Sequence, residues 1–256
     1  SHIGVDWTKT LKISGQPFFT RVVYLYSSAI TDCWVSQSEK DYLGKRLCYL
    51  AEKNPTFIPK LCKQLKSLAD EVTYFLGSHD PKKLFYKDLE AYWDLVSRYY
   101  LPHAGVKYMV DYLSEKELRG ALPALEKARL YAEPIFRNTE NFLEEFAQHI
   151  ANKNKYAKES ILAKVASEID SYMKGGPLPD EKILKQRFAR SALLVQSGKE
   201  QLVVGKGVVD VEKLTRVPLF SGRIAGQIAY PGKAVGKARI VLNPKEYTVV
   251  FNKGDV

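Results

Sequence analysis

Three charged side chains, Arg21, Arg129 and Glu133, occur where a charge could take part in binding. Arg21 lies in the stretch 18–34, whose only other charged residue is Asp32. An unpaired buried charge is costly, so Arg21 is expected either to bind an anionic ligand or to pair with a carboxylate such as Asp32 or Glu133. Arg129 and Glu133 have the four-residue spacing of neighbours on a helix, and they form either part of a binding pocket or a surface salt bridge. These three are the candidate substrate-binding residues.

The other residue types that commonly do chemistry form no recognised motif. Three cysteines, Cys33, Cys48 and Cys62, are too few and too widely spaced for a disulfide framework, and no cysteine or histidine pair has zinc-ligand spacing. They are expected to be reduced thiols packed in a cytoplasmic protein. The sequence contains no P-loop, no G-x-G-x-x-G phosphate loop and no G-x-S-x-G nucleophile elbow. It therefore predicts no catalytic residue, no metal site and no cofactor site in these 256 residues.

The C-terminal segment has the most specific pattern in the chain. Residues 226–241 read GQIAYPGKAVGKARIV, and residues 251–256 read FNKGDV. Pro231 and Gly232 suit the two central positions of a type II turn. The residues after it, 234–242, alternate between two faces as a β-strand does. A strand, a tight turn and a second strand are therefore predicted here.

This segment resembles the opening of the swivelling phosphohistidine domain of phosphoenolpyruvate-utilising enzymes, a family that includes phosphoenolpyruvate synthase, pyruvate phosphate dikinase and rifampin phosphotransferase. Residues 222–256 carry the resemblance, and residues 181–207 are similar to the segment that precedes this domain. The resemblance implies phosphoryl transfer from ATP or phosphoenolpyruvate, with Mg²⁺, through a carrier histidine to a small-molecule acceptor. None of the four histidines has the family's glycine-rich context. The chain is thus expected to be a piece that ends before the carrier, with the nucleotide-binding domain and the rest of the swivelling domain as its partners.

Helices are predicted over most of the first two-thirds of the chain. The stretch 18–34 is apolar nearly all round, which favours a buried central helix, although its β-branched and aromatic residues leave a strand possible. Further helices are expected from Asn54 to about Leu76, and from Asp80 onward with an interruption at Pro102 and Gly105. The capping box Ser114–Glu117 begins another, and the pattern from Leu122 to Ile150 predicts a helix that is kinked or split at Pro134. The last two are expected from Ile161 to Met173 and after Asp180.

The predicted fold class is α+β, mainly α. A helical domain, like the acceptor-binding part of such enzymes, is expected over residues 1–185. A short β-hairpin with strands at 192–195 and 201–204, followed by a linker at 211–218, occupies 186–218. The first strands of a truncated swivelling domain occupy 219–256. In the implied enzyme the linker would be the hinge of the swivelling domain.

Composition restricts the remaining functional classes. No apolar run approaches the ~20 residues that a membrane-spanning helix needs, so no membrane partner is predicted. The net charge of +10 attracts phosphates, yet the lysines are spread along the chain, and Lys60, Lys63 and Lys66 face away from a leucine stripe as on a solvated helix face. Nucleic acid is therefore not expected as a partner. Two alternatives stay open: a basic nucleic-acid-binding helical protein, and a non-catalytic interaction scaffold.

Overall fold

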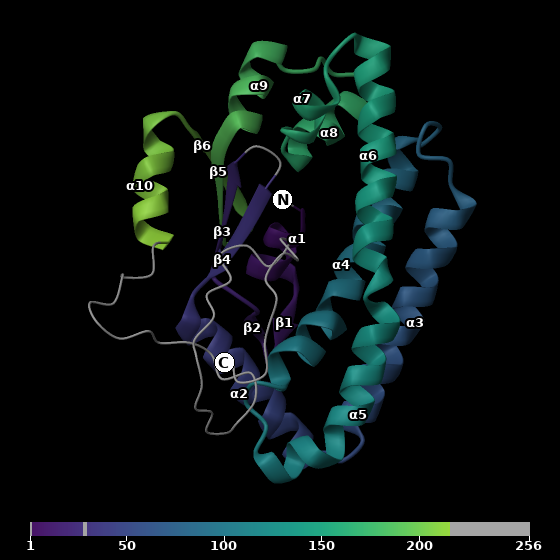
Figure 1. The fold of residues 1–256 in the computed structure, drawn as a ribbon, viewed down its shortest axis with the longest axis vertical. Helices are drawn as coiled ribbons and strands as arrows, with labels where there is room; N and C mark the ends of the chain where they lie inside the picture. Colours follow the sequence, from purple (N-terminus) through teal and green to yellow (C-terminus); the bar gives the residue numbers. More distant parts are fainter. Residues whose placement is uncertain (1, 28–29, 216–256) are drawn as a thin grey trace, which may run out of the picture. The chain divides into compact units, whose positions relative to one another are not determined.

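The computed structural model describes residues 2–27 and 30–215, which form a helical body and a small antiparallel sheet (Figure 1). This arrangement confirms the predicted α+β, mainly α, fold class. None of the helices in the described ranges combines the length and apolarity needed to cross a membrane. The elements in chain order are α1 His2–Val5, a π-helical turn Asp6–Thr10, β1 Lys12–Ile13, β2 Gln16–Pro17, β3 Arg21–Ser27, β4 Ile30–Val35, α2 Gln37–Lys53, α3 Phe57–Ser78, α4 Tyr86–Met109, α5 Glu115–Ala132, α6 Pro134–Asn154, α7 Lys158–Leu162, α8 Ala166–Met173, α9 Glu181–Ala189, β5 Arg190–Gln196, β6 Lys199–Val204 and α10 Lys206–Thr215.

The main sheet joins segments from the two ends of the described chain. Its strand order is β4-β3-β5-β6, and every neighbouring pair is antiparallel. Tyr26 of β3 lies opposite Thr31 of β4 and Ser191 of β5, which places the three side chains on one face. This face lines a pocket together with residues of α6, so it faces the helical body. The other face packs on Val208 and Val211 of α10.

The hairpin predicted near residue 196 is confirmed. β5 and β6 pair from Ser191 with Val204 to Gln196 with Lys199. Ser197 and Gly198 make the turn with φ of 51° and 77°. Two central residues with positive φ are typical of a type I′ turn, whose twist matches that of the flanking strands.

The buried helix favoured for residues 18–34 is wrong, because this stretch forms strands β3 and β4. Along β3 the apolar side chains alternate between the face toward the helical body and the face toward α10. A strand covered on both sides reads as a continuous apolar run, and such a run does not by itself distinguish a strand from a buried helix. The sheet partner β5 decides between them.

Three further expectations need correction. α4 continues through Pro102 and Gly105 to Met109, and both residues are buried in its packed face. The single helix expected at 161–173 is two helices, α7 and α8, separated by residues 163–165. The linker expected at 211–218 is helical up to Thr215, as the end of α10, while residues 216–218 lie outside the described residues. The helices expected from Asn54 and after Asp180 are confirmed as α3 and α9; the capping box of Ser114 begins α5, which runs on through Leu122 to the expected split at Pro134.

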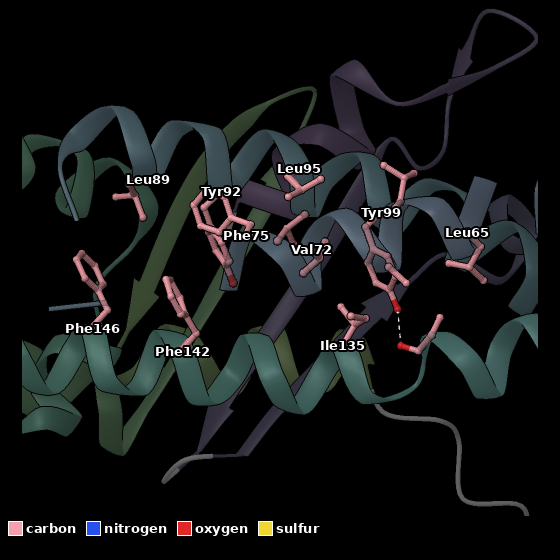
Figure 2. Packing of buried hydrophobic residues seen from close by; sticks show 14 of the residues in the cluster. Leu65, Val72, Phe75, Leu89, Tyr92, Leu95, Tyr99, Ile135, Phe142 and Phe146 are labelled. Carbon is pink, nitrogen blue, oxygen red and sulfur yellow. Dashed lines mark hydrogen bonds between the residues drawn. The ribbon is translucent and has the colours of Figure 1, made fainter. Parts of the chain in front are cut away.

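The main hydrophobic core fills the space between α3, α4 and the pair α5 and α6. Figure 2 shows Phe75 of α3 and Tyr92 of α4 directed toward Phe142 of α6, with the rings of Tyr92 and Phe142 stacked at 5.7 Å. The hydroxyl of the buried Tyr99 donates to the carbonyl of Ala132 at 3.0 Å, at the end of α5 (Figure 2). A buried hydroxyl needs such a partner, so this bond holds the α5–α6 junction against α4.

Candidate functional site

A pocket of about 410 Å³ lies between the four-stranded sheet and the helices α6, α7 and α9. Strands β3, β4, β5 and β6 form one wall, α6 forms a second, and residues 162–165 together with α9 complete it. In Figure 1, α7, α8 and α9 gather beside the strands at one end of α6. The volume falls in the range of small-molecule sites, and the lining mixes leucines with charged and hydroxyl groups, as such sites do.

Lys164 is the most unusual residue of this pocket. It lies in the break between α7 and α8 and lines both this pocket and an adjoining, mostly apolar cavity of about 140 Å³. Its Nζ atom is buried and forms no hydrogen bond within the described residues. Its pKa is lowered to about 8, mainly because burial disfavours the charged ammonium; the carboxylate of Glu168 opposes this shift, and the positive charge of Arg187 adds to it. Nζ lies 5.9 Å from the centre of the Tyr172 ring, but a buried amine without a hydrogen-bond acceptor is costly, so Lys164 is a candidate for contact with a ligand.

A second cation, Arg187 of α9, lines the same pocket. Its Nη1 atom donates to both carboxylate oxygens of Glu168 at 2.8 Å, and both side chains are largely buried. Glu168 also accepts from the backbone N–H of Val165 at 3.1 Å, at the start of α8. The ion pair therefore fixes the loop that carries Lys164. Arg187 keeps further N–H donors that this pair does not use.

The other polar groups of the pocket are hydroxyls and carboxylates. Tyr26, Thr31 and Ser191 contribute hydroxyls from the sheet, while Glu140 and Glu144 contribute carboxylates from α6. Burial, and then the charges of Cys33 and Glu200, raise the pKa of Tyr26 to about 12, so its hydroxyl is a neutral donor at pH 7. Lys158 neutralises Glu144 through an ion pair of 2.9 Å. The pocket thus offers cations on one side and hydrogen-bonding groups on the others.

Arg21, the first of the predicted site residues, does not lie in the pocket of Lys164. It is exposed at the start of β3, so the expected burial of its charge is wrong. It makes no ion pair with Asp32 or Glu133. Asp32 lies opposite Leu25, four residues further along β3, which is about 13 Å away. Arg21 instead lines a different pocket, on the face of the sheet toward α10.

Arg129 and Glu133 form an exposed pair at the junction of α5 and α6. Their closest nitrogen and oxygen atoms lie 3.9 Å apart, and more than half of each side chain is exposed. This geometry matches the surface salt bridge, one of the two alternatives open for them. Neither residue lines the pocket of Lys164 or that of Arg21. The structure does not bring the three predicted residues together.

Sequence reasoning missed Lys164, Arg187 and Glu168. Lys164 falls within the single helix expected at 161–173, where a lysine has a solvated position by default. The useful signal is weak: Val165 and Glu168 have the spacing of a capping box without a capping hydroxyl, and this marks a new helix start. Arg187 has no local signal, because its partner lies on another helix.

The remaining chemistry-bearing residues form no further centre. Within the described ranges, no three His, Cys, Asp or Glu side chains gather as metal ligands. Cys33 is exposed, Cys48 half-buried and Cys62 buried, and all three are free thiols. His103 is buried among Tyr99, Tyr100 and Phe136. Burial, and then the charges of Lys107 and Arg129, lower its pKa to about 4, so it is a neutral core residue at pH 7.

The resemblance to phosphoenolpyruvate-utilising enzymes rests mainly on residues 222–256, which lie outside the described residues. Comparisons of this chain with protein-family models, with curated proteins and with solved structures found no match.

Proposed function

We propose that the described unit binds a small anionic, hydroxyl-bearing molecule in the pocket of Lys164, as the acceptor site of a histidine-mediated phosphotransferase. The observation that carries the proposal is the buried Nζ atom of Lys164, which lacks a hydrogen-bond acceptor in a pocket of about 410 Å³. An anion from solution would supply that acceptor, and its charge would raise the pKa of Lys164 again.

The surroundings of Lys164 support this choice of ligand. Arg187 is held in place by Glu168 and has donors to spare, so the two cations can hold one anionic group between them. Glu140 of α6 makes no ion pair within the described residues, and its carboxylate can accept a hydrogen bond from a ligand hydroxyl. A phosphoryl acceptor needs such a hydroxyl, and a carboxylate close to it can act as a general base.

The resemblance of residues 222–256 supports the reaction type. In a phosphotransferase of that kind, ATP or phosphoenolpyruvate with Mg²⁺ would charge a carrier histidine, which would deliver the phosphoryl group to the acceptor. A neutral imidazole is nucleophilic near pH 7 and forms a labile N–P bond. The donor site and the carrier would come from partner segments of the same cytoplasmic protein, since no histidine of this chain has the required context.

Pyridoxal phosphate tests the pocket directly. The neutral amine of a lysine adds to its aldehyde and water leaves, and borohydride then delivers hydride to the imine carbon, leaving a stable secondary amine. With a pKa of about 8, roughly a quarter of Lys164 is neutral at pH 7.5, against about one in a thousand for an ordinary lysine. Peptide mapping should therefore find Lys164 modified first, and glycerate should slow its modification.

The matched control is Lys182, an exposed lysine on α9. It should react slowly, and glycerate should not protect it. Modification of Lys182 as fast as Lys164, or no protection of Lys164 by either glycerate or inorganic phosphate, would contradict the acceptor site.

A labelling experiment tests the phosphotransferase separately. This chain, incubated with labelled ATP or phosphoenolpyruvate and Mg²⁺, should give no acid-labile phosphoprotein. A longer form that includes the rest of the swivelling domain and a nucleotide-binding domain should be labelled on one histidine, and alanine at that position should abolish the label. Labelling of His79, His103 or His149 would show that the chemistry is misplaced, and an unlabelled folded longer form would favour the scaffold.

A further inference from the structure

A second pocket, also of about 410 Å³, lies on the opposite face of the sheet from Lys164. Strands β3, β4 and β5 provide its floor, the start of α2 one side, and the end of α10 another. This pocket is independent of the proposed acceptor site, because the two share no lining residue.

A carboxylate at this pocket has one oxygen unused. Oε1 of Glu39 accepts from the backbone N–H of Thr20 at 3.1 Å and from the Thr20 hydroxyl at 2.5 Å. Oε2 is buried and has no hydrogen-bond partner within the described residues. The contacts of Oε1 orient the carboxylate, and Oε2 keeps its capacity to accept from a cation.

A guanidinium lines the same pocket and is likewise unused. Arg21 follows Thr20 directly in the chain, and its side chain makes neither an ion pair nor a hydrogen bond within the described ranges. Arg21 and Glu39 would neutralise each other if they met, yet no ion pair joins them. Two opposite charges that line one pocket without pairing with each other match a ligand that carries both charges itself.

The rest of the lining selects an apolar group. Trp34 of β4, Leu194 of β5 and Leu214 of α10 line the pocket, and Leu214 is 82% exposed. An exposed leucine and an indole ring in a concave site suit an apolar or aromatic side chain.

The geometry points to a binding site for a free apolar α-amino acid, with the ligand's carboxylate on Arg21, its ammonium on Glu39 and its side chain against Trp34, Leu194 and Leu214. A zwitterion pairs with Arg21 and Glu39 at the same time, whereas a carboxylate or an ammonium alone pairs with one of them. This site lies outside the proposed acceptor chemistry and does not depend on it.

Calorimetric titration of the full 256-residue chain with leucine, N-acetyl-leucine and leucinamide tests the site. N-acetyl-leucine lacks the ammonium and leucinamide lacks the carboxylate. Leucine should bind in the millimolar range or tighter, and each blocked analogue should bind at least about tenfold more weakly, as expected for the loss of one charge-assisted contact. Equal binding of leucine and either analogue would reduce the site to one charge and overturn the proposal, as would the absence of leucine binding.

Variants that remove one charge at a time assign the two contacts. Arg21→Gln and Glu39→Gln should each weaken leucine binding by about tenfold or more, and Glu39→Gln retains the oxygen that accepts from Thr20. Arg137→Gln and Glu145→Gln, exposed positions on α6, are the matched controls and should bind leucine like the wild type. Unchanged leucine binding in Arg21→Gln, an exposed substitution with little effect on folding, would also overturn the proposal.

Discussion

Arg187 of α9 forms an ion pair with Glu168 of α8, and its Nη1 atom donates to both carboxylate oxygens at 2.8 Å. Only 14% and 23% of the two side chains are exposed. Because Glu168 also accepts from the N–H of Val165, this contact connects α9 to the break between α7 and α8. Lys164 lies inside that break, so the ion pair between Arg187 and Glu168 helps to fix its position.

Breaking this pair should destabilise the protein measurably. Glu168→Gln keeps the size of the side chain and removes its charge, which leaves the largely buried guanidinium of Arg187 without this counter-ion. We expect a loss of about 1–3 kcal/mol in the free energy of unfolding, measured in urea. The control is Asp94→Asn, which breaks an exposed pair with Arg98 and should cost under about 0.5 kcal/mol. Equal losses in the two variants would show that the buried pair of Arg187 and Glu168 stabilises the protein no more than an exposed pair does.

Lys164 should make stability depend on pH in the alkaline range. Its pKa is about 8 in the folded chain and near 10.5 when unfolded. Below pH 8 both states carry the proton, so the folded state bears the full cost of the buried charge. Between pH 8 and 10.5 the unfolded state binds more protons, and stability therefore rises with pH.

Comparison with Lys164→Met isolates this effect from other titrating groups. At pH 7 the variant should be more stable than the wild type by about 1–2 kcal/mol, a value reduced from the full shift because the residue is partly exposed. The difference should shrink at pH 9.5, as measured by urea unfolding at both pH values. Lys182→Met should show no such change. If the difference in unfolding free energy between Lys164→Met and the wild type is the same at pH 7 and at pH 9.5, a buried ammonium at position 164 is excluded.

Gly44 is required for the packing of α2. A Cβ atom at this position would lie 2.1 Å from Cδ2 of the Tyr112 ring, and the hydroxyl of that ring donates to Asp41 at 2.6 Å. Gly44→Ala should therefore lower the free energy of unfolding by about 1–3 kcal/mol, despite the better helix propensity of alanine. Gly120→Ala on α5 is the control: nothing lies within 4 Å, so it should gain up to about 1 kcal/mol. A stabilised Gly44→Ala variant would contradict the close contact.

His103 should make the protein sensitive to acid. Its folded pKa of about 4 lies below the ordinary value of 6.5, because burial disfavours the charged ring. Between pH 6.5 and 4 the unfolded state binds the extra proton, so stability falls as pH falls through this window. The loss should reach at most about 3 kcal/mol. His103→Phe, which keeps a ring against Phe136, should lose less stability over that range in acid unfolding experiments; identical pH profiles would count against a neutral buried histidine.

Local sequence signals predicted many element boundaries correctly. The Ser114 capping box, the Asp180 cap, the split at Pro134 and the turn between the strands expected at 192–195 and 201–204 are all present. Each is decided by hydrogen bonds or backbone sterics among residues a few positions apart. Such information is complete within a short stretch of sequence, and it does not require the rest of the fold.

Long-range contacts decided what the sequence alone could not. Whether residues 21–27 form a strand or a helix depends on β5, which pairs with them from the other end of the described chain. Likewise, Lys164 differs from the exposed lysines only because the sheet, α6 and α9 surround it. Apolar periodicity and residue type are local quantities, whereas burial and the pairing of charges depend on segments that only folding brings together.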